Sequence, residues 1–120
     1  MNGPESEAQR ESSLQAEIST DVAKLHRDRT GRGPTSVQCH IHGDTVTLVL
    51  TGVVTKLEET LIEDGRAEAV DAQRSELNAV LAPEIGALVA TALDRDVKFC
   101  TIGTSIEDDA VGITVTFRRP

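Results

Sequence analysis

The chain has 120 residues, a net charge of −8 and a pI of about 4.8. That length predicts a single domain. The acidic charge argues against partners such as nucleic acid or anionic lipid, because both are bound mainly through basic side chains. Aromatic residues make up only 2% of the chain, namely Phe99 and Phe117, which argues against a base-stacking surface as well.

The N-terminal residues are polar, and we expect residues 1–7 to be disordered and one folded domain to cover residues 8–118. There is no secretory signal and no run approaching the ~18 apolar residues of a membrane-spanning helix. The cysteines Cys39 and Cys100 form no CxxC pair, so we interpret them as reduced core residues. These features predict a cytoplasmic protein without direct membrane insertion.

An apolar stripe followed by a glycine-proline turn indicates the first helix. The spacing of the stripe predicts a helix over about 6–29, and its members are Leu14, Ile18, Val22 and Leu25. Gly31 fits the residue of positive φ that commonly ends a helix. Pro34 then favours an extended chain leaving that turn.

Alternating apolar and polar residues predict a β-hairpin with strands at about 36–42 and 45–53. The dipeptide Gly43-Asp44 supplies its two-residue turn. Because side chains alternate between the two faces of a strand, one set points outward from the core. That outward set is Gln38, His40, His42, Thr47 and Val49.

The second half of the chain predicts two helices and another hairpin. Thr55 and Glu58 form a capping box for a short helix to Glu63, which residues 64–65 either end or kink. A long helix follows over about 66–93, with a bend or break near Leu81-Ala82 caused by Pro83. The last hairpin has strands at 97–102 and 110–117, joined by a long polar turn at 103–109.

The resulting order is α-ββ-α(α)-ββ. It predicts an α+β fold, with a four-stranded, mostly antiparallel sheet and helices packed on one face.

Two small clusters invite a ligand-binding interpretation. His40 and His42 lie two apart on a strand, so they could share a metal, although surface or interface histidines explain the pattern more simply. The turn Gly31-Arg32-Gly33 could bind an anion through its backbone N–H groups and the guanidinium. The alternative is a helix-to-strand turn in which Arg32 caps carbonyls or forms a salt bridge.

Two acidic clusters could in principle perform acid–base chemistry if they lay in a dry cleft. They sit where exposed turns and helix starts are expected, so we interpret them as solvated surface; they are Glu58, Glu59, Glu63 and Asp64, and Glu107, Asp108 and Asp109. Ser105 and Thr104 have no histidine and acid partners in a recognisable order. We therefore predict no catalytic residues, no cofactor and no enzymatic activity.

Several residues together resemble a known family. They are Glu17-Ile18, then Gly31-Arg32-Gly33-Pro34, then Gly52, Thr55 and Glu58 of a G-x-[LV]-T-x-x-E pattern, then Gly65-Arg66, and Arg74 within the long helix. With two closing strands, this arrangement over about residues 14–117 resembles the small bacterial MpsC-like family. It is named for a sodium-translocating, membrane-potential-generating system.

The resemblance implies a soluble accessory component associated with membrane proteins that take up cations or inorganic carbon. It implies no catalytic residue and no cofactor. Our first hypothesis is thus an accessory or regulatory homodimer that contacts partners, including an integral membrane transporter, through the first helix and the outward face of the first hairpin. The alternatives are an anion or small-molecule sensor using Arg32 and a metal-binding protein using His40 and His42.

Overall fold

The computed structural model describes residues 6–120, which form three helices and four strands around one core. The predicted disordered segment 1–7 falls mostly outside this range, although Ser6 already caps the first helix. In chain order the elements are α1 (Glu7–Thr30), β1 (Ser36–His42), β2 (Thr45–Thr51), α2 (Lys56–Glu63), α3 (Ala67–Leu93), β3 (Val97–Ser105) and β4 (Ala110–Phe117).

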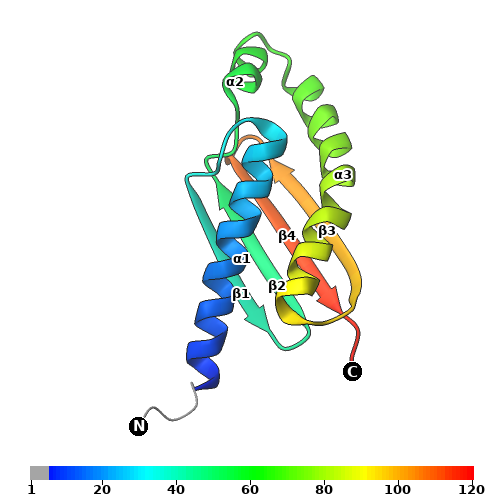
Figure 1. Ribbon diagram of the computed structural model, residues 1–120. Helices are drawn as coiled ribbons and strands as arrows, with labels where there is room; N and C mark the ends of the chain where they lie inside the picture. The colour runs from blue at the N-terminus through cyan, green and yellow to red at the C-terminus, as the bar shows by residue number, and fades with distance from the viewer. Residues whose placement is uncertain (1–5) are drawn as a thin grey trace.

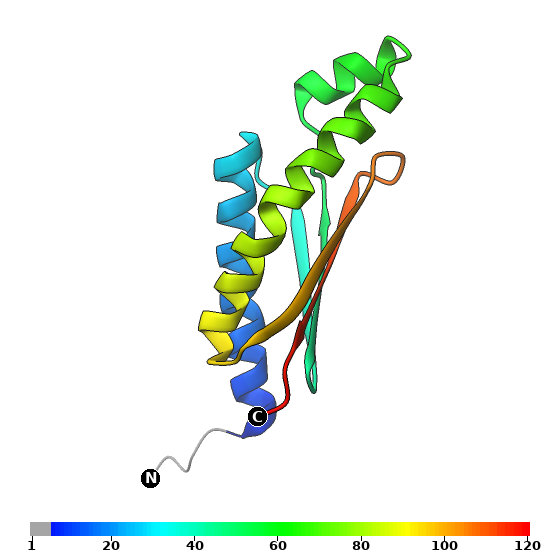
Figure 2. The same cartoon turned by 90° about the vertical axis from the view of Figure 1, so that its right-hand side faces the viewer.

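The four strands form one antiparallel sheet in the order β1-β2-β4-β3. Helices α1 and α3 pack on one face of it and leave the other face open (Figure 1, Figure 2). Leu48 pairs with Cys39 on one side and with Ile113 on the other, so apolar residues line up across the strands on the helix-covered face. The predicted α+β architecture is confirmed.

The core lies between the helices and this face of the sheet. Branched aliphatic residues dominate it because the chain offers almost no aromatics; its fully buried members include Ile18, Val22, Val46, Leu48, Leu50, Ile85, Val89, Ile113 and Val115. Cys39 is buried and Cys100 packs against the core, both as free thiols. Burial raises the pKa of the Cys39 thiol to about 11, which keeps this sulfur protonated.

Two strand boundaries differ from the prediction. β2 ends at Thr51 rather than at residue 53, because Gly52 turns the chain with a φ of +70°. β3 continues to Ser105, so only residues 106–109 remain as the turn predicted over 103–109. The glycine taken as the start of that turn, Gly103, instead pairs with Gly112 across the ladder.

The long helix α3 is not broken at Pro83. Pro83 lies on the exposed side of the helix, where the loss of one backbone donor is tolerated. By length and composition alone, α3 is apolar enough to cross a membrane, although polar residues interrupt its apolar sequence. In the fold, its residues Leu81, Ile85 and Val89 are buried in the core.

Helix α2 and the first half of α3 extend beyond the end of the sheet (Figure 1, Figure 2). We call α2 with residues 67–76 of α3 the arm. The arm contributes to the elongated shape of the molecule, whose principal extents are 60 × 29 × 21 Å. The arm joins the body where three polar residues, His26, Glu58 and Arg74, are buried.

Candidate functional site

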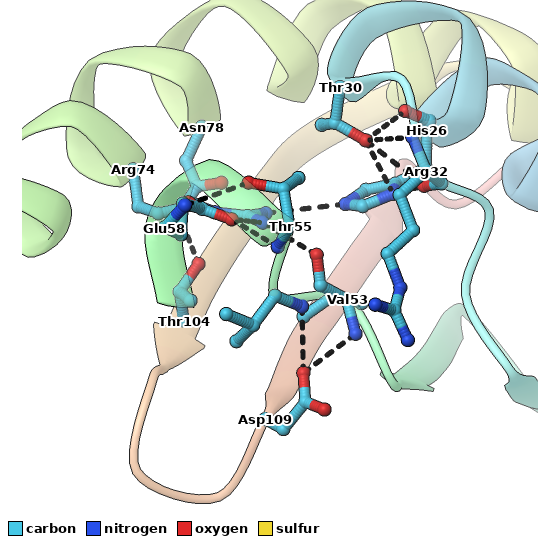
Figure 3. A network of polar contacts seen from close by, with 11 residues as sticks. His26, Thr30, Arg32, Val53, Thr55, Glu58, Arg74, Asn78, Thr104 and Asp109 are labelled. Carbon is cyan, nitrogen blue, oxygen red and sulfur yellow. Dashed lines mark hydrogen bonds and ion pairs between the residues drawn. The ribbon is translucent and has the colours of Figure 1, made fainter. Parts of the chain in front are cut away.

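Polar side chains from distant parts of the chain meet where α1 and β2 end, α2 begins and α3 passes (Figure 3). We call this cluster the junction and define it as His26, Arg32, Thr55, Glu58 and Arg74. Three of its members are buried, with 2% of His26, 6% of Glu58 and 3% of Arg74 exposed. Buried ionisable groups need partners, and here each supplies a partner for another.

The centre of the junction is a two-pronged ion pair between Arg74 and Glu58. The Arg74 Nε donates to Glu58 Oε2 at 2.6 Å, and Nη2 donates to Glu58 Oε1 at 2.6 Å. Nη2 also donates to the carbonyl oxygen of Val53 at 2.8 Å, which attaches α3 to the chain leaving β2. This parallel geometry is the strongest form of arginine–carboxylate contact.

Glu58 also completes the predicted capping box of α2. Its Oε1 accepts from the Thr55 N–H at 2.8 Å, while the Thr55 hydroxyl accepts from the Glu58 N–H at 3.2 Å. Burial alone would raise the pKa of Glu58, but hydrogen bonds from Arg74 and Thr55 outweigh it and hold that pKa below its usual value. The prediction that Glu58 is solvated is wrong, because Arg74 supplies a partner 16 residues further along.

His26 has its two ring nitrogens in different hydrogen-bonding roles. Nδ1 lies 3.2 Å from the Arg32 carbonyl oxygen, which only accepts, so Nδ1 carries the proton. Nε2 lies 3.4 Å from Arg74 Nη1, which only donates, so Nε2 keeps its lone pair. The contacts thus specify a neutral imidazole, and protonating Nε2 would place a cation against the guanidinium.

We expect the stability of the protein to fall as the pH drops below 6.5. Burial, together with the nearby Arg74 charge, lowers the pKa of His26 from its ordinary 6.5, although hydrogen bonding to Arg32 and the Glu58 charge oppose this. As the pH falls below 6.5, His26 is protonated in the unfolded chain before it is protonated in the folded protein. Protonation therefore stabilises the unfolded chain between those two pKa values, and the free energy of unfolding falls. Urea unfolding at pH 7 and pH 5.5 measures the effect. His26→Gln should flatten the dependence of the free energy of unfolding on pH; equal pH dependence in the two proteins would contradict the expectation.

The end of β2 is held by Arg32 and Asp109. The Arg32 Nε donates to the Gly52 carbonyl oxygen at 3.0 Å. Asp109 Oδ1 accepts from the N–H groups of Val53 and Val54, at 2.7 and 2.8 Å. Asp109 is half-buried, so the prediction that its whole cluster is solvated surface is wrong for this residue, whereas its neighbours Glu107 and Asp108 are exposed.

The turn predicted as an anion site uses several of its donors within the protein. Gly31, with a φ of +82°, donates its N–H to the Arg27 carbonyl oxygen and ends α1. The Arg32 N–H donates to the Thr30 hydroxyl at 3.3 Å. Gly33 lies beside the Arg27 side chain. This geometry suits a helix-to-strand turn, and anion binding stays a prediction.

The proposed metal ligands His40 and His42 do share the open face of the sheet, with ring centroids 5.9 Å apart. Cys39 faces the opposite way into the core. Among residues 6–120, no group of three or more His, Cys, Asp or Glu side chains is placed to hold a metal ion. The predicted interface residues Gln38, Thr47 and Val49 lie on this same open face.

Reasoning from the sequence missed the role of His26. A signal was present, because His26 continues the apolar stripe of α1 four residues after Val22. Arg74 formed part of the family pattern but had no assigned role, since nothing in its local sequence indicates which carboxylate it pairs with. Only the fold brings it to Glu58.

A family model described as Na+-translocating membrane potential-generating system (MpsC) matches residues 10–119. The chain belongs to the MpsC family. Searches of curated proteins and of solved structures find no match. The MpsC-like features noted in the sequence include Gly52, Thr55, Glu58 and Arg74, which lie in or beside the junction.

Proposed function

We propose that this MpsC-family chain is a non-enzymatic accessory or regulatory protein of a membrane cation-translocating or inorganic-carbon uptake system. It acts by protein–protein contact, and it does so as a homodimer paired through the open face of the sheet. The family description supports the membrane association. The junction supports the non-enzymatic part, because both nitrogens of His26 and both oxygens of Glu58 already serve contacts within the protein.

The observation that carries the contact surface is the scarcity of charge on the open face, where Lys98, at the bulge of β3, is the one charged residue of the four described strands. Charged residues make up 27% of the chain, yet every paired residue of this face is neutral. These residues are Ser36, Gln38, His40, His42, Thr45, Thr47, Val49, Thr51, Phe99, Thr101, Gly103, Ser105, Ala110, Gly112, Thr114 and Thr116.

A neutral face suits self-association of an acidic protein. Two copies that each carry a charge of −8 repel one another, and contact is least costly where no carboxylates are desolvated. The exposed Val49 and Phe99 add apolar area, at 42% and 47% exposure. A two-fold symmetric pair would bring the same patch of both copies together.

Val49→Asp should weaken the dimer by about 10–100-fold, because the symmetric interface receives the buried charge twice. Sedimentation equilibrium at micromolar concentrations measures the dissociation constant, and circular dichroism checks the fold. Val80→Asp is the matched control, since Val80 is exposed on α3, away from this face. A monomeric wild-type protein, or a Val49→Asp protein that dimerises normally, would contradict the proposal.

A further inference from the structure

Helix α2 buries a charged residue, Glu58, and leaves the apolar Leu57 on its surface. Glu58 is its only buried residue, whereas Leu57 is 66% exposed and Leu61 and Ile62 are only partly covered. A short amphipathic helix of a soluble protein normally turns its apolar side to the core. Leu57 is therefore an apolar side chain of α2 that the described part of the chain leaves mostly uncovered, whereas Leu61 and Ile62 lie beside Glu58 and are half-buried.

Two hollows on the surface adjoin α2. One, of about 220 Å³, has Leu57 and Leu77 in its wall, together with the side chains of Arg29 and Gln73. The other hollow, of about 250 Å³, has Ile62 and Ile106 in its wall. Both hollows combine apolar side chains with polar edges, as grooves that accept a partner segment do.

The junction fixes α2 in place before any partner arrives. The ion pair from Arg74 and the capping box from Thr55 both act on Glu58, on the buried side of the helix. Leu57 is the neighbouring residue and stays exposed. A pre-positioned surface lowers the entropic cost of binding.

Charge selects the kind of occupant. Residues 56–76 and 106–109 contain ten Asp and Glu side chains and only three Lys and Arg, a net charge of −7 out of the −8 of the whole chain. Three of these carboxylates, from Glu59, Glu63 and Asp109, lie in the wall of the second hollow. The first hollow instead has Arg29 and Arg74 in its wall beside Glu58. A basic partner is favoured here, whereas an anionic lipid surface is repelled.

We propose that the exposed side of α2 and its two flanking hollows form a docking surface for a basic amphipathic segment of a partner protein. Such a segment places Leu-like side chains in the hollows and its Lys or Arg side chains against the acidic rim. Cytoplasmic loops of membrane proteins carry an excess of Lys and Arg. That the segment comes from a membrane protein rests on the proposed function. The surface around α2 would then contact the membrane protein, while the open sheet face contacts the second copy of the chain.

The test uses a labelled 18-residue synthetic peptide with lysines on one helical face and leucines on the other, titrated with the protein at 150 mM salt. The wild-type protein should bind it, as measured by fluorescence anisotropy. Leu57→Asp should weaken binding at least tenfold, although it makes the protein more negative. Val49→Asp, which changes the open sheet face, should leave peptide binding unchanged.

Each other outcome counts against the docking surface. Equal or tighter peptide binding by Leu57→Asp would mean that charge alone attracts the peptide. A loss of dimer in Leu57→Asp would mean that a second copy covers α2. The dimer face is judged separately by sedimentation of Val49→Asp, so the two proposals fail independently. Because Leu57 is mostly exposed, Leu57→Asp should leave the free energy of unfolding in urea unchanged, which shows that the variant is folded.

Discussion

Replacing Arg74 with methionine should lower the free energy of unfolding by about 3–5 kcal/mol, because it leaves the carboxylate of Glu58 buried without its partner. The Val53 carbonyl oxygen and the His26 Nε2 lose their donors as well. Urea unfolding followed by circular dichroism at pH 7 measures the change.

Two further variants separate this effect from the loss of a side chain. Arg29→Met removes an arginine that pairs with Glu84 on the surface, and it should cost far less because water solvates both charges. The double variant Glu58→Leu with Arg74→Met removes both charges together and should recover much of the lost stability. A cost no greater than that of Arg29→Met would show that the buried pair does not hold the junction together.

Replacing Gly52 with alanine should destabilise the protein by more than the roughly 1–2 kcal/mol that a left-handed conformation costs an L-residue. Gly52 has a φ of +70°, and a Cβ there would overlap Thr35 Oγ1 and lie 2.8 Å from Thr35 Cβ. The Cβ of Thr35 is fixed to the backbone, so the strands have to shift. Thermal and urea unfolding both report the loss.

Gly43→Ala is the matched control for this change. Gly43 also has a positive φ, of +56°, but its added Cβ would meet nothing within 4 Å. It should therefore show the conformational cost alone. If both glycine variants lose the same stability, the close approach of Thr35 to Gly52 adds no steric cost, which would contradict the prediction.

Local signals account for much of the fold. The apolar stripe of α1, the glycine-aspartate turn between β1 and β2, and the Thr55 capping box each depend on residues close together in the chain. Such signals act before any tertiary contact forms, so they can be read from one sequence. They place most helix and strand boundaries within two residues of those in the structure.

The predictions that fail depend on contacts between distant residues. Glu58 looked like part of a solvated cluster because its neighbours Glu59 and Glu63 are charged, and only the fold supplies Arg74. Gly103 looked like the start of a turn because its partner Gly112 is remote in sequence. Of the bend or break predicted for α3 at Pro83, only the break is wrong, because α3 packs on the sheet and continues past Pro83 as one helix.

The junction connects stability with the proposed function. Through the contacts of Arg74 with Val53 and His26, it attaches the arm, which carries the exposed Leu57, to the body that carries the open sheet face. Weakening the junction should therefore disturb peptide docking more than dimer formation. The family features Gly52, Thr55, Glu58 and Arg74 are then understood as residues that position a contact surface, with no chemical step assigned to them.

Crosslinking in native cells tests whether this protein acts as an accessory component of a membrane system. Cells are crosslinked, soluble and membrane fractions are kept apart, and the protein is recovered from each in wild-type and Leu57→Asp forms. We expect stoichiometric recovery of an integral membrane protein with the wild type and its loss with Leu57→Asp. Recovery of crosslinks only between copies of this chain, and only from the soluble fraction, would contradict the proposed accessory role.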